Sequence, residues 1–153
     1  MTASIDIAPL APTAEVLAAL TDMLLQVVAD GASVSFLHPL ERDVAEAFWR
    51  QSLSDAGDGG RIVLGAFDQG ALVGTVILLL DMPQNQQHRG EIAKLMTRLS
   101  ARRMGLARAL MQQAEQIAIS RGRRMLTLDT ATVDGAGPLY EKLGYTAAGV
   151  IPD

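Results

Sequence analysis

The chain has 153 residues, of which 49% are hydrophobic and 20% are charged, with a net charge of −4. This length and balance are typical of a globular protein, and we expect one domain spanning residues 1–153. The absence of cysteine excludes disulfides, thiol catalysis and thiolate metal sites. The two histidines, His38 and His88, are far apart in the sequence, so we expect no zinc site and no other metal.

The amino terminus has neither the basic nor the apolar region of a signal peptide. The longest mainly apolar stretch, residues 71–80, is too short to cross a bilayer. We therefore expect a cytoplasmic protein without a membrane partner.

The first part of the chain predicts a strand followed by two helices. Residues 5–10 are typical of a short strand that ends at prolines, and residues 13–30 have the apolar spacing of a helix capped by Gly31. Residues 41–53 predict a second helix, and the glycines and aspartates of residues 54–60 predict a loop.

Residues 31–40 link the two helices and combine small residues with an apolar cluster. This linker is either a lid over an acceptor pocket or a connector whose Phe36 and Leu37 fill the core.

The second part predicts a sheet that is covered on both faces. Residues 61–68 and 71–81 are apolar nearly throughout and surround Gln69-Gly70, which indicates a hairpin. A polar loop, a third strand, a basic turn and a long helix follow, at residues 82–88, 91–97, 98–103 and 104–121. A strand, a short helix and a further strand complete the prediction, at residues 125–130, 138–143 and 145–151. This order indicates an α/β fold with a mixed sheet.

The start of the long helix has the properties of a phosphate site. The first N–H groups of a helix lack intrahelical acceptors, and the helix dipole places partial positive charge there. Gly105 and the small Ala107 let a ligand approach the backbone, and Arg102, Arg103 and Arg108 surround it.

The charge distribution supports the same site. Residues 89–124 contain nine basic and two acidic residues, a balance of +7, so the rest of the chain sums to −11. This asymmetry indicates a polyanionic ligand, and the alternative is a basic helix surface that binds nothing.

The hexapeptide from Arg102 to Ala107 resembles the diphosphate loop of the GNAT superfamily of acyl-CoA-dependent N-acetyltransferases, Arg/Gln-x-x-Gly-x-Gly/Ala. Residues 138–145 resemble the family's closing helix, and the likeness extends over residues 4–151. It implies a mixed, mostly antiparallel central sheet flanked by helices, with acetyl-CoA as cosubstrate. It also implies a cofactor site made of Leu95, Met96, Thr97, Arg102, Arg103, Met104, Gly105, Leu106, Ala107 and Arg108.

A narrower resemblance links residues 31–36, 89–96 and 128–130 to the tabtoxin-resistance subgroup of this family. It implies a small amino-acid-like or antibiotic-like amine as acceptor. GNAT domains usually continue with a final hairpin strand, whereas this chain stops at Asp153. Either the sequence is truncated or another chain completes the sheet, as in a homodimer.

Acetyl transfer needs a base, because only about one alkylamine in 10³ is neutral at pH 7. The candidates are Glu91, at the start of the central strand and favoured by the subgroup resemblance, and Asp129, favoured by its place beyond a strand end. A solvated strand end and a loop cap are the alternatives for these two residues. Tyr140 matches the family's acid, which acts by a hydrogen bond to the leaving sulfur or through a lowered pKa, and it is otherwise a core aromatic.

Two further functions remain as alternatives. One is a sensor that binds acyl-CoA without catalysis, and the other is acetylation of a protein N-terminus or lysine. We expect no nucleic-acid partner, because residues 89–124 contain no Phe, Tyr or Trp for base stacking and the chain is acidic.

Overall fold

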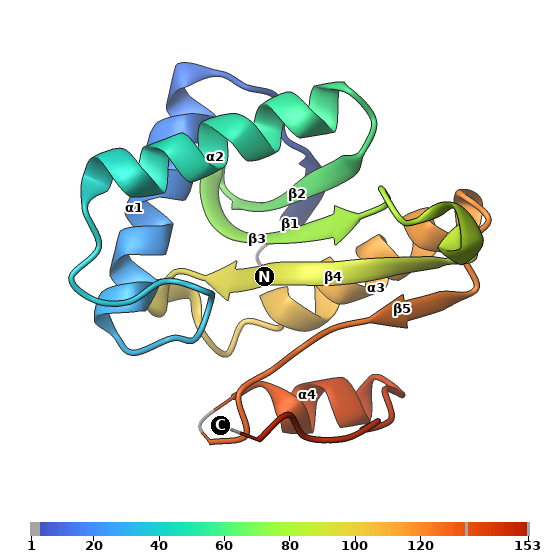
Figure 1. Cartoon of the computed structure of the whole chain (residues 1–153). Coiled ribbons are helices and arrows are strands. Elements are labelled where there is room, and N and C mark those ends of the chain that lie inside the picture. Colours follow the sequence, from blue (N-terminus) through green and yellow to red (C-terminus); the bar gives the residue numbers. More distant parts are fainter. Residues whose placement is uncertain (1–3, 134, 153) are drawn as a thin grey trace.

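The computed structural model describes residues 4–133 and 135–152. Its sheet has five strands in the order β1-β2-β3-β4-β5 (Figure 1). The first four pair antiparallel, and β5 pairs parallel to β4. The strands are β1 (Ile5–Pro9), β2 (Arg61–Asp68), β3 (Ala71–Leu79), β4 (Arg89–Thr97) and β5 (Met125–Thr127). The predicted mixed, mostly antiparallel sheet is therefore confirmed.

Helices cover both faces of this sheet (Figure 1). The four α-helices are α1 (Ala14–Ala29), α2 (Arg42–Gly57), α3 (Leu106–Ser120) and α4 (Gly137–Lys142). Helices α1 and α2 share one buried apolar cluster with Val63 and Ile77, whereas α3 and Tyr140 of α4 share the other with Leu64 and Leu78. Successive residues of a strand point to opposite faces, so the alternation along β2 and β3 supplies both clusters.

The hairpin between β2 and β3 forms where its turn residues predict it. Gln69 and Gly70 both have positive φ, 51° and 83°, as a two-residue turn that matches the twist of its strands requires. Every residue of β3 from Leu72 to Leu78 is buried, because helices lie on both sides. The prediction of a doubly covered sheet is confirmed.

Three predicted boundaries are wrong for local reasons. Helix α2 continues to Gly57, through most of the predicted loop, and its last turns include a side-chain hydrogen bond from Gln51 to Asp55. Helix α3 begins at Leu106 rather than Met104, because the left-handed backbone of Gly105 cannot be helical. Strand β5 ends at Thr127 rather than Thr130.

The predicted strand at residues 145–151 is also wrong, since these residues are neither helix nor strand. A strand forms only where a neighbour supplies hydrogen bonds to its backbone. The described part of the sheet ends at β5, whose three residues pair with β4 and carry no ladder on their other side.

Within the described residues, no helix combines the length and the apolar character that crossing a membrane requires.

Candidate active site

Strand β4 contains an extra residue opposite β3. Ile77 pairs with Ala93 and Thr75 pairs with Met96, so two residues, Lys94 and Leu95, lie opposite Val76 alone. This is a β-bulge, and Lys94 adopts φ 54° within it. Leu95, the second residue of the bulge, contacts the cluster on the α3 face, and Met96, which follows it, belongs to the cluster on the α1 and α2 face.

Strands β4 and β5 separate soon after their pairing begins. Their parallel ladder comprises three pairs and ends at Glu91 with Thr127. From there the chain after β5 diverges from β4 and runs toward α4 (Figure 1). Within the described residues, the edge of β4 from Ile92 to Thr97 is therefore without a partner on the β5 side.

A cavity of about 400 Å³ lies where the strands diverge. It is lined by residues 31–35, 91–95 and 129–131, and by Val133, Gly135, Ala136 and Tyr140. Glu91, Asp129 and Tyr140, which are far apart in the sequence, thus meet at one cavity. A second hollow of about 510 Å³, lined by residues 58–61 with Asp55, Leu80 and Asp81, contains none of the predicted site residues.

The two carboxylates line the cavity from neighbouring segments, Glu91 from β4 and Asp129 from the chain after β5. Glu91 is two residues from Ala93, which packs in the cluster on the α1 and α2 face, so the two side chains share that face. Asp129 follows two residues after Thr127, which is the ladder partner of Glu91 and the last residue of β5. Glu91 is half-buried, whereas Asp129 is exposed beyond the end of β5.

Tyr140 reaches the same cavity from the opposite side. It is buried in the cluster that packs against α3, and its ring meets that of Tyr145 edge-on at 6.0 Å. Burial raises the pKa of Tyr140 above its usual value. This direction favours the hydrogen-bonding alternative over a lowered tyrosine pKa.

The loop before α3 has the open backbone that a phosphate site requires. Gly105 precedes the helix with φ 76°, and a Cβ built on it would meet nothing within 4 Å. Arg102, Arg103 and Arg108 are exposed around this point, as are the backbone of Gly105 and the side chain of Met104, whereas Leu106 is buried in the core. Arg102 pairs with Asp30 at 3.2 Å, which ties the loop to the end of α1.

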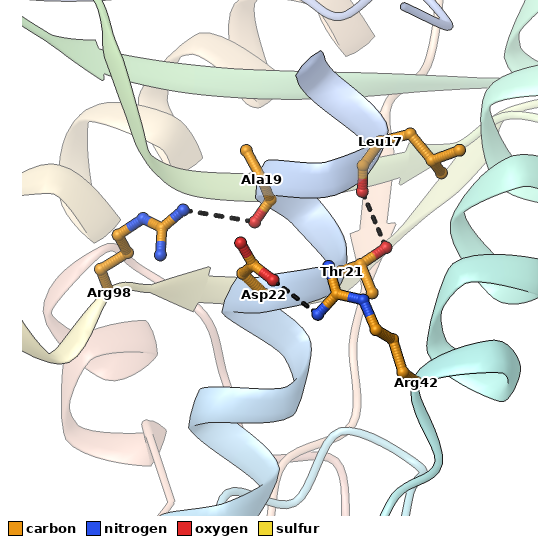
Figure 2. Close-up of polar contacts among 6 residues, drawn as sticks. All are labelled: Leu17, Ala19, Thr21, Asp22, Arg42 and Arg98. Atoms are coloured by element: carbon orange, nitrogen blue, oxygen red, sulfur yellow. Dashed lines mark hydrogen bonds and ion pairs between the residues drawn. The ribbon is translucent and has the colours of Figure 1, made fainter. Parts of the chain in front are cut away.

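Part of the basic segment has a structural role. Arg98 donates from Nη2 to the Ala19 carbonyl at 3.4 Å, which connects the loop to α1 (Figure 2). Its Nε donates to the Leu72 carbonyl at 2.9 Å, which connects the loop to β3. Arg123 donates to the Arg89 carbonyl at 3.1 Å. These contacts account for two of the nine basic residues without any ligand, whereas Arg102, Arg103 and Arg108 are exposed around Gly105.

The linker contributes both to the lining of the cavity and to the core. Residues 31–35 line the cavity, while Phe36 packs edge-on against Phe48 at 5.3 Å in the core. Leu37 is 88% exposed, so the prediction that it fills the core is wrong.

Sequence reasoning missed Lys94 as a cavity residue and counted it only as a charge. In the part of the chain that the structure describes, no cluster of three His, Asp or Glu side chains could hold a metal.

Known proteins share this architecture. The family model described as the acetyltransferase (GNAT) family matches residues 23–145. An acetyltransferase of Trypanosoma brucei is 22% identical with a TM-score of 0.70, and the alignment covers 98% of both chains.

Two similar structures were solved with the coenzyme. A predicted acetyltransferase of Clostridium acetobutylicum with acetyl-CoA is 13% identical, with a TM-score of 0.73 over 98% of this chain and 95% of that one. A PaiA N-acetyltransferase of Thermoplasma acidophilum in complex with coenzyme A is 17% identical, with a TM-score of 0.72 over 94% of this chain and 90% of that one. These likenesses concern the fold, and the family model covers most of the sequence. The chain belongs to the acetyltransferase (GNAT) family.

Proposed function

We propose that this protein transfers an acetyl group from acetyl-CoA to the primary amine of a small amino-acid-like or antibiotic-like molecule, within one domain spanning residues 1–153. The observation that carries the proposal is the cavity at the divergence of β4 and β5, where Glu91, Asp129 and Tyr140 meet. Family membership supports the acetyl transfer. The resemblance of residues 31–36, 89–96 and 128–130 to the tabtoxin-resistance subgroup supports the acceptor class.

The unpaired edge of β4 and the loop before α3 fit a coenzyme. Backbone groups of Leu95, Met96 and Thr97 are the candidates for hydrogen bonds to its pantetheine arm, because β5 does not pair with them. The N–H groups that begin α3 would bind the diphosphate, together with Arg102, Arg103 and Arg108. Met104, Leu106 and Ala107 contribute only backbone in this proposal. Acetyl-CoA supplies the acyl group as a thioester.

The acceptor enters as an ammonium ion and must lose a proton before it attacks. Glu91 and Asp129 are the two candidates for the base, acting directly or through water. The neutral amine then attacks the thioester carbonyl carbon, the new C–N bond forms and the C–S bond breaks. The base passes the first proton to solvent and can then take the second proton, which the nitrogen sheds as the amide forms.

Tyr140 acts on the leaving group. An unperturbed phenol is a weaker acid than a thiol by about 1.5 pKa units, or about 2 kcal/mol. Because burial raises the pKa of Tyr140 further, we propose that its hydroxyl donates a hydrogen bond to the thiolate as the C–S bond breaks. The sulfur then takes its proton from solvent.

The test is a screen of primary amines with acetyl-CoA, read by thiol release, beside calorimetry of acetyl-CoA binding. The proposal expects binding and amine-dependent thiol release. The variants Glu91→Gln and Asp129→Asn show which carboxylate is the base. The variant that loses the catalysed rate at pH 7 but keeps the coenzyme affinity identifies that residue. Coenzyme binding without turnover on any amine would support the sensor instead, and turnover restricted to peptides would support a protein acceptor. Absence of binding would refute the proposal.

A further inference from the structure

The bulge in β4 determines which way Lys94 points. In an unbroken strand Lys94 would share the α3 face with Ile92, because residues two apart lie on the same side. The extra residue instead gives that face to Leu95, whose side chain packs in the α3 cluster. Lys94 turns toward the α1 and α2 face, the side on which Ala93 packs and Glu91 lies.

There the Lys94 ammonium has neutral partners. Its Nζ donates to the Ser35 hydroxyl at 3.1 Å and lies 5.5 Å from the centre of the Phe48 ring. Phe48 is itself held edge-on between Phe36 and Trp49, at 5.3 Å and 5.0 Å. The four ion pairs found among residues 4–133 and 135–152 do not include Lys94. Within the described residues, the Lys94 ammonium therefore forms no ion pair.

This charge lies in the proposed acceptor cavity. Lys94 and Ser35 both line the cavity that also holds Glu91 and Asp129. Burial lowers the pKa of Lys94, and the nearby Glu91 charge opposes that effect. An anion beside the ammonium would relieve its desolvation. A hydroxyl that accepts from Lys94 can also donate its own hydrogen to an anion.

We propose that Lys94 and Ser35 bind the carboxylate of the acceptor, so that the substrate is a free amino acid or a close analogue. The assignment rests on the function proposed above and makes its acceptor class specific. Glu91 and Asp129 attract the ammonium end, and Lys94 binds the carboxylate end. A simple amine would leave Lys94 unpaired, and a lysine side chain within a protein has no carboxylate beside its amine.

Paired acceptors separate this role from a purely structural one. Each amino acid is compared with the amine that lacks only its carboxyl group: methionine with 3-(methylthio)propylamine, phenylalanine with phenethylamine, and serine with ethanolamine. In the wild type, kcat/KM should favour the amino acids. Lys94→Met keeps the length and apolar stem of the side chain but removes the charge. It should lower kcat/KM for amino acids about tenfold to hundredfold, mainly through KM, as expected for a lost hydrogen bond to a charged group.

The same variant should leave kcat/KM for the paired amines and the acetyl-CoA affinity unchanged. Lys94→Arg should restore most of the amino-acid preference, since it restores the positive charge. If Lys94 only holds residues 31–35 in place, Lys94→Met should lower kcat/KM for amino acids and for the paired amines alike. Equal effects on both classes, or a wild type that prefers the amines, would overturn the assignment.

A binding measurement keeps the test independent of turnover. N-acetylmethionine and N-acetyl-3-(methylthio)propylamine are titrated into the protein saturated with CoA. The carboxylate should strengthen binding to the wild type and not to Lys94→Met. If neither amino acids nor simple amines are acetylated but this difference in binding appears, the proposed function fails and the carboxylate site stands. If acceptors of either class are acetylated and the difference in binding is absent, the proposed function stands and the carboxylate site is wrong.

Discussion

Two tyrosines in contact have different relations to the cavity. Tyr140 lines it, whereas Tyr145 packs against the Tyr140 ring and does not. Burial is the main cause that raises the pKa of each phenol, and for Tyr145 the negative charge of Glu115 adds to it. This pair therefore offers a reacting hydroxyl and a matched control.

Tyr140→Phe should lower kcat at least about tenfold, because it removes the hydrogen bond to the leaving sulfur and keeps the ring. The affinity for acetyl-CoA, measured by calorimetry, should not change. Tyr145→Phe is the control, and its kcat should stay near that of the wild type. If both variants lose activity equally, the effect comes from packing and the role of Tyr140 is wrong.

The raised tyrosine pKa values also predict how stability depends on pH. Below pH 10 each phenol is protonated in both states, and its contribution to stability is complete. As pH rises above 10, the unfolded chain ionises its tyrosines first, so the free energy of unfolding falls through the raised folded pKa. Urea unfolding at pH 8, 10 and 11 should show this fall, and Tyr145→Phe should reduce it. A fall of the same size in the variant would contradict the prediction.

At the scale of elements, patterns local in sequence were predictable and patterns that depend on a partner were not. The β2–β3 turn follows from Gln69-Gly70, and α1 follows from its apolar spacing. The bulge at Lys94 depends on how β4 pairs with β3, which no short window contains. Residues 145–151 have strand-like apolar residues but no neighbouring edge. Glu91 and Tyr140 were predicted from resemblances to the family and Asp129 from its place beyond a strand end, whereas their convergence required the structure.

The proposed diphosphate site at the start of α3 can be tested by comparing the same substitution at Gly105, before the helix, and at Gly122, after it. Gly105 and Gly122 have nearly the same backbone, φ 76° and 75°, and a Cβ at either would meet nothing within 4 Å. Asp at either position should lower stability by about 1–2 kcal/mol, because a side chain disfavours left-handed φ.

Only Gly105→Asp should also weaken acetyl-CoA binding, by more than about tenfold, since it places bulk and negative charge where the diphosphate is proposed. Calorimetry on both variants measures this difference. Equal affinities would show that the diphosphate is bound elsewhere.

At the scale of the molecule, the sheet opens between β4 and β5, which pair over only three residues. Strands β1 to β4 and helices α1 to α3 form most of the two apolar clusters on either side of the sheet. The hydrogen-bonded ladder between β4 and β5 nevertheless ends at Thr127. Beyond it, α4 is held by the packing of Tyr140, Leu143 and Tyr145 in the α3 cluster. A coenzyme lying along β4 would contact both parts and would substitute for the missing ladder.

Acetyl-CoA should therefore stabilise the whole fold and protect one strand edge in particular. At a concentration 100 times its dissociation constant, a ligand that binds only the folded state adds about 2.7 kcal/mol to the free energy of unfolding. Hydrogen exchange should slow most at residues 92–97 and at the first turn of α3, where free N–H groups would acquire acceptors. Helix α2 lies on the other side of the sheet from α3, so its amides should change only as much as global stabilisation requires. Protection concentrated in α2, with none at residues 92–97, would place the coenzyme outside the gap between β4 and β5.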